Sequence, residues 1–374
     1  MAKNKIIPVC EPFLGGREME LVKDAISSGW ISSAGHYIDE FQNSFAQYHN
    51  VKHCVAVANG TAALEVSLHA IGIEKGDHVI IPSFTIMSLA LAVLRLGAVP
   101  RVVDVDPDSW NITAEAISLV LTEKTRAIIV VHSFGQPVDM DPILELIQGK
   151  DVKLIEDTAE SIGSSYKGQL CGAIGDIGSF SFYANKLITT GEGGCILTNS
   201  DKYAERASRY VNMYFGKNER FAHDDLGYNF RMTNLQAAIG VAQLEQIDDF
   251  AKKKRQIGKW YSEAIAGCDT LDFQKSVGDI DHVYWMYCVV LKDHIEMDAS
   301  GAMKFLKERG VDTRNLFKGL HQQTPLRPHL VETDLDKKFP VTEKLYSRGF
   351  YLPSAINLTR NDIEGIVEIL KDLK

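Results

Sequence analysis

The sequence predicts an α/β protein in which a large domain with a mostly parallel β-sheet is followed by a smaller C-terminal α+β domain. Two observations lead to this prediction. From about residue 50, short β-branched runs alternate with helical patterns, and Ala127–His132 is almost entirely apolar, as in a strand buried on both faces of a parallel sheet. Beyond residue 177 the alternation ends, and the tail carries strands and helices of its own.

The expected elements follow one another in the order of a βαβ protein. Apolar β-branched runs predict strands, and apolar residues at helical spacing predict helices. The expected strands are Cys54–Ala58, His78–Pro82, Arg101–Val105, Ala127–His132, Val152–Asp157, Ser179–Tyr183, Cys195–Thr198, Val283–Leu291 and Gly349–Leu352. The expected helices are Thr61–Ile71, Ile86–Leu96, Asn234–Ala264, Ala299–Glu308 and Arg360–Leu373.

Length and composition set the scale of the fold. A chain of 374 residues with 45% apolar content is long enough for two domains with substantial cores. We place the large domain at residues 15–248 and the small domain at residues 249–374, and we expect residues 1–14 to pack on the small domain. No apolar run approaches the ~20 residues of a membrane span, so no membrane association is expected.

The charged residues and cysteines indicate which kinds of partner the protein binds and in which cellular compartment it is found. The net charge of −9 argues against a nucleic-acid binder, which needs a basic face to meet phosphates. The basic run Lys252–Arg255 lies in a predicted helix and is expected to be a solvated face. Six dispersed cysteines without a C-x-x-C pair predict reduced thiols in a cytoplasmic protein, and neither a disulfide framework nor a metal site.

A lysine lies between a predicted strand and a glycine-rich turn. Lys186 follows the run Ser179–Tyr183 and precedes Gly191–Gly194. A lysine that is fixed by packed neighbours and followed by small residues approaches a flat ligand closely. The alternative interpretation is a surface lysine after an edge strand, and the local motif alone favours that alternative.

An acid ends the predicted strand Val152–Asp157. Ligands of α/β proteins bind at the carboxyl ends of the strands, so Asp157 is a candidate partner for a protonated ring nitrogen. The alternative is that Asp157 caps a helix that begins near Thr158. In that case Glu160 would form the other half of a capping box.

A strand meets a helix at Gly60 and Thr61. Free backbone N–H groups and the positive end of the helix dipole suit a phosphate there, whereas the alternative is a plain strand–helix turn. The motif G-x-x-x-x-G-K-[ST] is absent from the sequence, and no G-x-G-x-x-G follows the first strand. Neither a P-loop nucleotide triphosphatase nor a Rossmann oxidoreductase is therefore expected.

An amine, an acid for a ring nitrogen and a phosphate-binding turn are together what the cofactor pyridoxal 5′-phosphate (PLP) requires. With these features in this order, the chain resembles the sugar aminotransferase family of PLP fold type I, the DegT/StrS family. The resemblance covers essentially the whole chain and implies that fold. It rests on the segments Trp30–Ser33, Asn59–Thr61, Ile155–Glu160, Ser179–Lys186, Thr190–Gly194 and Gly227–Asn234.

The resemblance implies how residues at matching positions meet the cofactor. It assigns Lys186 to catalysis, as the residue that carries PLP in a Schiff base. It assigns Asp157 to the pyridine nitrogen and places Glu160 near the hydroxyl edge of the cofactor. The residues expected to hold the phosphate within the same chain are Gly60, Thr61 and Ser181.

The resemblance also implies a second subunit and a substrate site. Asn229 is expected to reach the phosphate from the neighbouring subunit, with Arg231 close by, so a homodimer with shared active sites is expected. Trp30, Arg231 and His321 are the expected substrate-binding residues. For His321 the alternative is an ordinary, partly buried histidine.

Two positions depart from the pattern of the family. Ile86 stands where an aromatic residue usually stacks on the cofactor ring, and the change removes a stacking contribution of roughly 0.5–1.5 kcal/mol. The arginine–proline pair near the sugar site is replaced by Arg314 and Asn315. We expect weaker cofactor binding at the first position and an altered substrate contact at the second.

The resemblance implies transfer of an amino group from glutamate to a nucleotide-linked keto sugar. Within the family the chain is most similar to the GDP-perosamine synthases, in Ile188–Gly194 and Ala237–Glu245, which favours GDP-4-keto-6-deoxymannose as the acceptor. A UDP- or dTDP-linked 4-keto or 3-keto sugar is the alternative. The related sugar 3-dehydratases carry histidine in place of Lys186, which argues against that reaction. A PLP-binding regulator is the non-enzymatic alternative, although no DNA-binding module is present.

Overall fold

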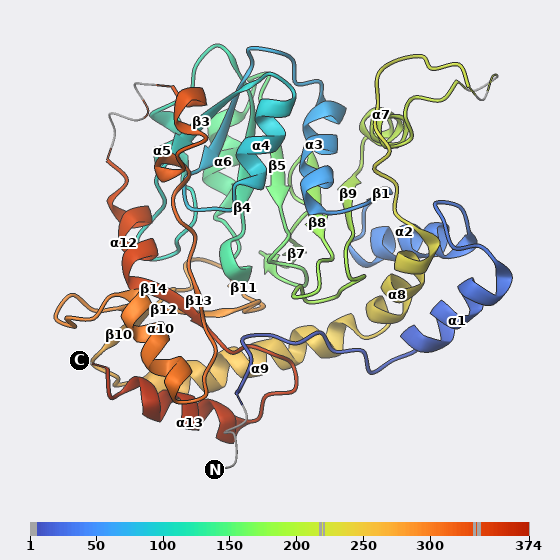
Figure 1. The fold of residues 1–374 in the computed structure, drawn as a ribbon. Helices are drawn as coiled ribbons and strands as arrows, with labels where there is room; N and C mark the ends of the chain where they lie inside the picture. Colours follow the sequence, from blue (N-terminus) through green and yellow to red (C-terminus); the bar gives the residue numbers. More distant parts are fainter. Residues whose placement is uncertain (1–5, 217–218, 220, 332–333, 335–337, 374) are drawn as a thin grey trace.

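A seven-stranded sheet lies at the centre of the protein, in the order β1-β9-β8-β5-β4-β2-β3 (Figure 1). The computed structural model describes residues 6–216, 219, 221–331, 334 and 338–373. Neighbours from β3 to β8 pair in parallel, whereas β9 pairs antiparallel with β8 and β1, so the expected mostly parallel sheet is confirmed. Its strands are β1 (His53–Val57), β2 (His78–Pro82), β3 (Val99–Val103), β4 (Thr125–Val131), β5 (Lys153–Asp157), β8 (Ile177–Ser181) and β9 (Gly194–Thr198).

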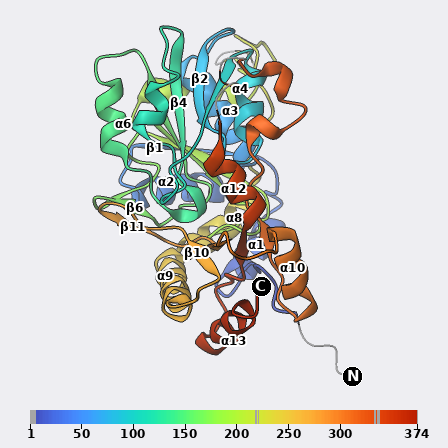
Figure 2. The same cartoon turned by 90° about the vertical axis from the view of Figure 1, so that its left-hand side faces the viewer.

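Helices cover both faces of this sheet. Figure 2 shows α6 on one side and α3 and α4 on the other. Because successive side chains of a strand point to opposite faces, Ile129 and Ile155 pack toward α3 and α4, whereas Ile128 and Leu154 pack toward α6. This two-sided burial explains the nearly unbroken apolar run of β4. The covering helices are α3 (Gly60–Ile71), α4 (Ser88–Arg95) and α7 (Asp201–Val211), and α5 (Ala114–Ser118) and α6 (Met140–Ile147).

Two N-terminal helices, α1 (Glu18–Ser28) and α2 (His36–Tyr48), pack on α8 (Asn234–Leu244) and on the outer part of the sheet. The apolar face of α2 carries Phe41 and Phe45 four residues apart, as in an amphipathic helix. Their rings meet Phe182 and Phe180 edge to face, at 5.2 and 5.1 Å between centroids. This aromatic cluster anchors the strand that leads to Lys186.

A second, antiparallel sheet has the order β10-β12-β14-β13. It lies with α9, α10 and α13 at the lower end of Figures 1 and 2. The N-terminal segment joins it, since Ile7 pairs with Val311 and Val9 accepts a backbone hydrogen bond from Ser354. The elements are α9 (Ile247–Ile265), β10 (Leu271–Phe273), β12 (Tyr287–Leu291), α10 (Ala299–Glu308), β13 (Arg314–Asn315), α12 (Pro340–Arg348), β14 (Gly349–Leu352) and α13 (Arg360–Leu370).

The division into domains 15–248 and 249–374 stays a prediction, and residues 1–5 lie outside the described residues. Short elements complete the fold. Among the described residues, no helix is both long enough and apolar enough to cross a membrane. The short elements are the sheet of β11 (Ile280–Asp281), β6 (Ser165–Tyr166) and β7 (Gln169–Leu170), and the 3₁₀ turns Ser133–Gly135, Leu320–Gln322 and Arg327–His329.

The long helix expected at Asn234–Ala264 is two helices, α8 and α9, separated after Leu244. At the break, the side chain of Gln246 donates to Glu18 on α1 and to the carbonyl of Ala242. The break lets α8 pack on α1 and α2, while α9 packs on α13. The helical spacing of apolar residues continues across both helices, so the sequence pattern does not predict the break.

The basic run Lys252–Arg255 is not a uniformly solvated face, because Lys254 is 3% exposed. Its ammonium donates to the main-chain oxygens of Trp285 and Ser354. Burial lowers the pKa of Lys254 to about 8. The prediction fails at this residue because charge pattern alone does not reveal two buried carbonyl groups from distant segments.

Candidate active site

A pocket of about 810 Å³ lies where β5, β8 and the start of α3 meet. Its walls bring together segments that are separated by more than a hundred residues in the chain. The sequence-predicted residues that line it are Gly60, Thr61, Ile86, Asp157, Glu160, Ser181 and Lys186.

The start of α3 forms one end of the pocket. Asn59 caps the helix, and its side-chain oxygen accepts the N–H of Ala62 at 2.9 Å. The first N–H groups of a helix have no partner within it, so those of Gly60 and Thr61 remain for a ligand at the positive end of the helix. A Cβ atom on Gly60 would lie 2.7 Å from the Cβ of Ser181. Glycine thus keeps this cradle open beside the Ser181 hydroxyl.

Lys186 lies in the turn between β8 and β9, where its backbone N–H donates to the carbonyl of Tyr183 at 2.9 Å. Its Nζ lies 4.0 Å from the centroid of the Trp285 ring. Burial lowers the pKa of Lys186, while the nearby carboxylates of Glu160 and Asp157 oppose that shift. The side chain is therefore a pocket amine with an enlarged neutral fraction, and the surface-lysine alternative is wrong.

Asp157 ends β5 with its side chain in the pocket. Residues 159–163 form turns, so the helix cap at Asp157 and the capping box with Glu160 are both wrong. The Asp157 Oδ1 accepts the N–H of Ala159 at 3.1 Å. Burial raises the pKa of Asp157, and the Ala159 N–H and Lys186 oppose the shift. A buried carboxylate of this kind binds a cationic group strongly.

Glu160 lies in the turn that follows Asp157 and faces Lys186. Burial raises the pKa of Glu160 to about 7, so its carboxyl group exchanges a proton at neutral pH. One oxygen accepts the N–H of Phe134 at 2.8 Å, and Phe134 has a left-handed backbone with φ of 56°. Such strain in a non-glycine residue is typical of functional sites.

These groups fit PLP. The pocket offers an amine, a buried carboxylate and an open cradle at a helix N-terminus. In addition, the buried side-chain oxygen of Asn185 has no hydrogen-bond partner among the described residues, although Asn185 lines the pocket. A buried polar atom without a partner in a pocket indicates a polar ligand.

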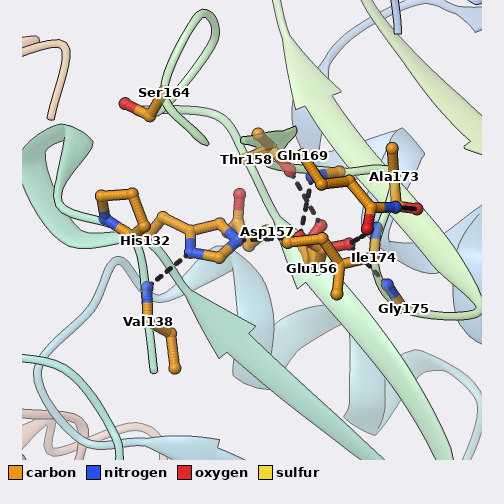
Figure 3. Close-up of polar contacts among 12 residues, drawn as sticks. His132, Val138, Glu156, Asp157, Thr158, Ser164, Gln169, Ala173, Ile174 and Gly175 are labelled. Carbon is orange, nitrogen blue, oxygen red and sulfur yellow. Dashed lines mark hydrogen bonds and ion pairs between the residues drawn. The ribbon is translucent and has the colours of Figure 1, made fainter. Parts of the chain in front are cut away.

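The residue before Asp157, Glu156, carries a third buried carboxyl group, which forms a hydrogen-bond network of its own (Figure 3). Glu156 is fully buried and accepts the N–H groups of Gly172, Ile174 and Gly175 at 2.7–2.8 Å. Its Oε2 also lies 3.1 Å from Nε2 of His132. The carboxylate therefore joins β5 to the loop after β7 and to the end of β4, directly beside Asp157.

The hydrogen bonds of His132 define its tautomer. Its Nδ1 accepts the N–H of Val138 at 3.0 Å, which leaves Nε2 as the protonated nitrogen that donates to Glu156. Burial lowers the pKa of His132, and Cys171 and Glu156 raise it above its usual value. The Val138 N–H nevertheless leaves no room for a proton on Nδ1, so we assign the neutral ring.

The sequence analysis did not identify several residues of the site. Glu156 carries one signal, a carboxyl group that directly follows the apolar pair Leu154–Ile155 in a buried strand. Three aromatic residues of the C-terminal part carry none, since aromatic residues near strands are usually core residues. They are Trp285, Phe317 and Tyr351; Asn315, which the sequence analysis placed near the sugar site, also lines the pocket.

Four sequence-predicted residues do not line the pocket of the single chain. Trp30 is 58% exposed. His321 is engaged elsewhere, with Nδ1 at 2.7 Å from the Ser83 hydroxyl and Nε2 at 3.2 Å from Glu343. Asn229 and Arg231 flank Phe230, which does line the pocket. The functional assignments of these four residues stay predictions.

The site and the fold define a PLP-dependent aminotransferase of fold type I. The chain belongs to the DegT/DnrJ/EryC1/StrS aminotransferase family, which it matches over residues 12–371. It is 38% identical over 367 residues to the GDP-perosamine synthase of Vibrio cholerae, a match that covers 98% of this chain and 99% of the relative.

Solved structures agree in fold. The aminotransferase TlmJ of Streptoalloteichus hindustanus superposes with a TM-score of 0.90 at 28% identity, over 98% of each chain. The E. coli GDP-4-keto-6-deoxy-D-mannose-3-dehydratase with bound hydrated PLP has a TM-score of 0.92 at 22% identity, over 98% of this chain and 100% of the other. At that identity, the second likeness concerns the fold alone.

The Glu156 network makes a testable prediction. In Glu156→Gln, one of the two carboxylate positions becomes an NH₂ group that faces two N–H donors. We expect the free energy of unfolding to fall by roughly 1–3 kcal/mol for each donor left without an acceptor, measured by urea denaturation. Glu368→Gln, at a side chain that is 70% exposed, is the matched control and should change stability little. Equal stability of the two variants would contradict the network.

Proposed function

We propose that this aminotransferase transfers an amino group from glutamate to a nucleotide-linked keto sugar, with GDP-4-keto-6-deoxymannose as acceptor and GDP-perosamine as product. The observation that supports it most is the meeting of Lys186, Asp157 and the start of α3 in one pocket. The similarity to GDP-perosamine synthases over nearly the whole chain supports the choice of sugar.

The pocket suggests how the chain holds its cofactor. In our proposal the N–H groups of Gly60 and Thr61 and the hydroxyl of Ser181 bind the phosphate, and Asp157 pairs with the pyridine nitrogen. When bound, PLP supplies an electron sink for the electron pair left when a C–H bond of the substrate breaks. We propose that Ile86, which lines the pocket and is 53% exposed, covers the ring.

Lys186 is the proposed base and acid of the reaction. Burial of its Nζ increases the fraction of neutral amine, which can take a proton from the α-carbon of the donor. The resulting ammonium group would then give that proton to a different carbon, as net transfer of an amino group requires. The carboxylate of Glu160 favours the ammonium form of Lys186 in between. Because Glu160 has a pKa of about 7, it can share that proton at neutral pH.

We also propose that two copies of the chain form a dimer with shared active sites. Asn229 and Arg231 each form an isolated antiparallel bridge, so this segment is extended. Since Phe230 between them faces the pocket of its own chain, its two neighbours point away from it. Exposed apolar side chains on nearby segments, Trp30 and Tyr228 among them, support burial by a second copy. The six free cysteines support a cytoplasmic location.

Covalent attachment at Lys186 is testable. The purified protein should be yellow, and borohydride should bleach the visible band while fixing PLP to the peptide that contains Lys186. Peptide mass spectrometry identifies the site. Lys186→Ala should abolish labelling, whereas Lys253→Ala should not change it. PLP fixed to Lys254, the buried lysine behind the pocket, would contradict the assignment.

Subunit complementation tests the shared site. A mixture of Lys186→Ala and Arg231→Ala proteins, each inactive alone, should regain at most about a quarter of wild-type activity, because half of the randomly formed dimers are heterodimers with one intact site of two. A mixture of Lys186→Ala and Asp157→Asn is the control and should stay inactive, since both residues act within one chain. No recovery in purified Lys186→Ala/Arg231→Ala heterodimers would place Arg231 in its own site.

The choice of sugar is tested by comparing kcat/KM for GDP-, UDP- and dTDP-linked 4-keto-6-deoxy sugars with glutamate as donor. We expect the GDP sugar to be favoured by roughly 5- to 150-fold, the effect of one buried polar group left unpaired at 1–3 kcal/mol. A preference for the UDP or dTDP sugar would contradict the perosamine assignment and leave the aminotransferase in place. It would also point to Asn315 and Ile86, the two departures from the family pattern.

A further inference from the structure

We propose that the face of the Trp285 indole is the place where Lys186 rests as an ammonium group, which makes Trp285 a positioning residue for the proton transfers of Lys186. This inference rests on the proposed function and concerns the same pocket. A cation within about 6 Å of a tryptophan ring is attracted to its negative face, most strongly where water is excluded. The Nζ of Lys186 lies 4.0 Å from the ring centroid, and Trp285 is 5% exposed.

The indole is fixed with respect to the lysine. Its Nε1 donates to the carbonyl of Asn185, the residue before Lys186, at 2.7 Å. The backbone carbonyl of Trp285 accepts a hydrogen bond from the buried ammonium of Lys254 on α9. The ring also stacks with that of Phe134, with 6.1 Å between centroids and 14° between planes. The ring therefore has little freedom to rotate away from Lys186.

The other titratable groups that face Lys186 do not replace this contact. They are Glu160, Asp157 and the Cys10 thiol, and Lys254 lies beside Cys10. Asp157 is assigned to the cofactor nitrogen, and Glu160, which also accepts the Phe134 N–H, titrates near neutral pH and competes for the proton. An indole face attracts the ammonium but has no basic site, so it stabilises the charge and leaves the proton on Nζ.

The test uses the cofactor-free protein and therefore does not depend on catalysis. Trace acetylation by acetic anhydride across a pH series reports the neutral amine at each lysine, read by peptide mass spectrometry against the exposed Lys259. In Trp285→Leu, the ammonium group of Lys186 loses its contact with the indole ring, and this loss favours the neutral amine. At pH values below the midpoint of its acetylation profile, acetylation of Lys186 should rise roughly 5- to 30-fold, and the profile should shift to lower pH. Trp285→Phe keeps a weaker π face and should restore part of the wild-type profile.

A matched control exists on the surface of α9. The Nζ of Lys253 lies 4.5 Å from the Trp260 centroid, so Trp260→Leu removes a comparable contact away from the pocket and should leave the Lys186 profile unchanged. If Trp285 only filled space, truncation would admit water and move the Lys186 profile to higher pH. An unchanged profile, or a shift to higher pH, in a folded Trp285→Leu protein overturns the proposal.

The outcomes separate this inference from the proposed function. If the acetylation profile of Lys186 is unchanged and borohydride still fixes PLP to Lys186, the positioning role of Trp285 is wrong and the aminotransferase assignment stands. Fixation at another lysine would remove the assigned role of Lys186, whatever the acetylation profile. If Trp285→Leu does not fold, Trp285→Phe must still shift the profile in the same direction by a smaller factor, and no shift overturns the proposal.

Discussion

The fully buried carboxylate of Glu156 is the constraint on which the active-site end of the sheet depends. Three backbone N–H groups and the neutral His132 ring converge on it, so the charge is shared by four donors, and among the described residues no ammonium or guanidinium group pairs with it. A buried charge is tolerated only with such a set of hydrogen bonds. Because Glu156 and Asp157 are consecutive, this arrangement fixes the strand end from which Asp157 enters the pocket.

The pocket also depends on a contact between distant segments. Lys254 on α9 binds the carbonyls of Trp285 and Ser354, while the Trp285 ring donates to Asn185. A chain of contacts thus runs from α9, through the segment before β12, to the turn that carries Lys186. Loss of any member would disturb the lysine without touching it directly, since a polar group left unpaired in a buried site is costly.

Periodicity was enough to predict the strands of the central sheet and α3, and strand-end chemistry made Gly60 and Asp157 candidates, whereas Lys186 was assigned only once the three features were taken together with the resemblance to the family. These features are local, since each depends on a run of adjacent residues or on a strand–turn junction. The break between α8 and α9 and the burial of Lys254 depend on partners at residues 18, 285 and 354, which no local pattern indicates. For the same reason the sequence does not identify Trp285 and Tyr351 as pocket residues, because their neighbours in the chain are those of ordinary core residues.

The division between local and distant residues has a functional counterpart. The groups assigned to the cofactor lie at or just after the ends of β5 and β8 and at the start of α3, which packs on the central sheet. Asn315 and Tyr351 enter the same pocket from β13 and β14 of the second sheet. In our proposal the strand ends hold the cofactor and the second sheet forms the wall that meets the substrate. Asn315 lies on that wall, so a change of side chain there would alter the sugar accepted and leave the groups assigned to the cofactor in place.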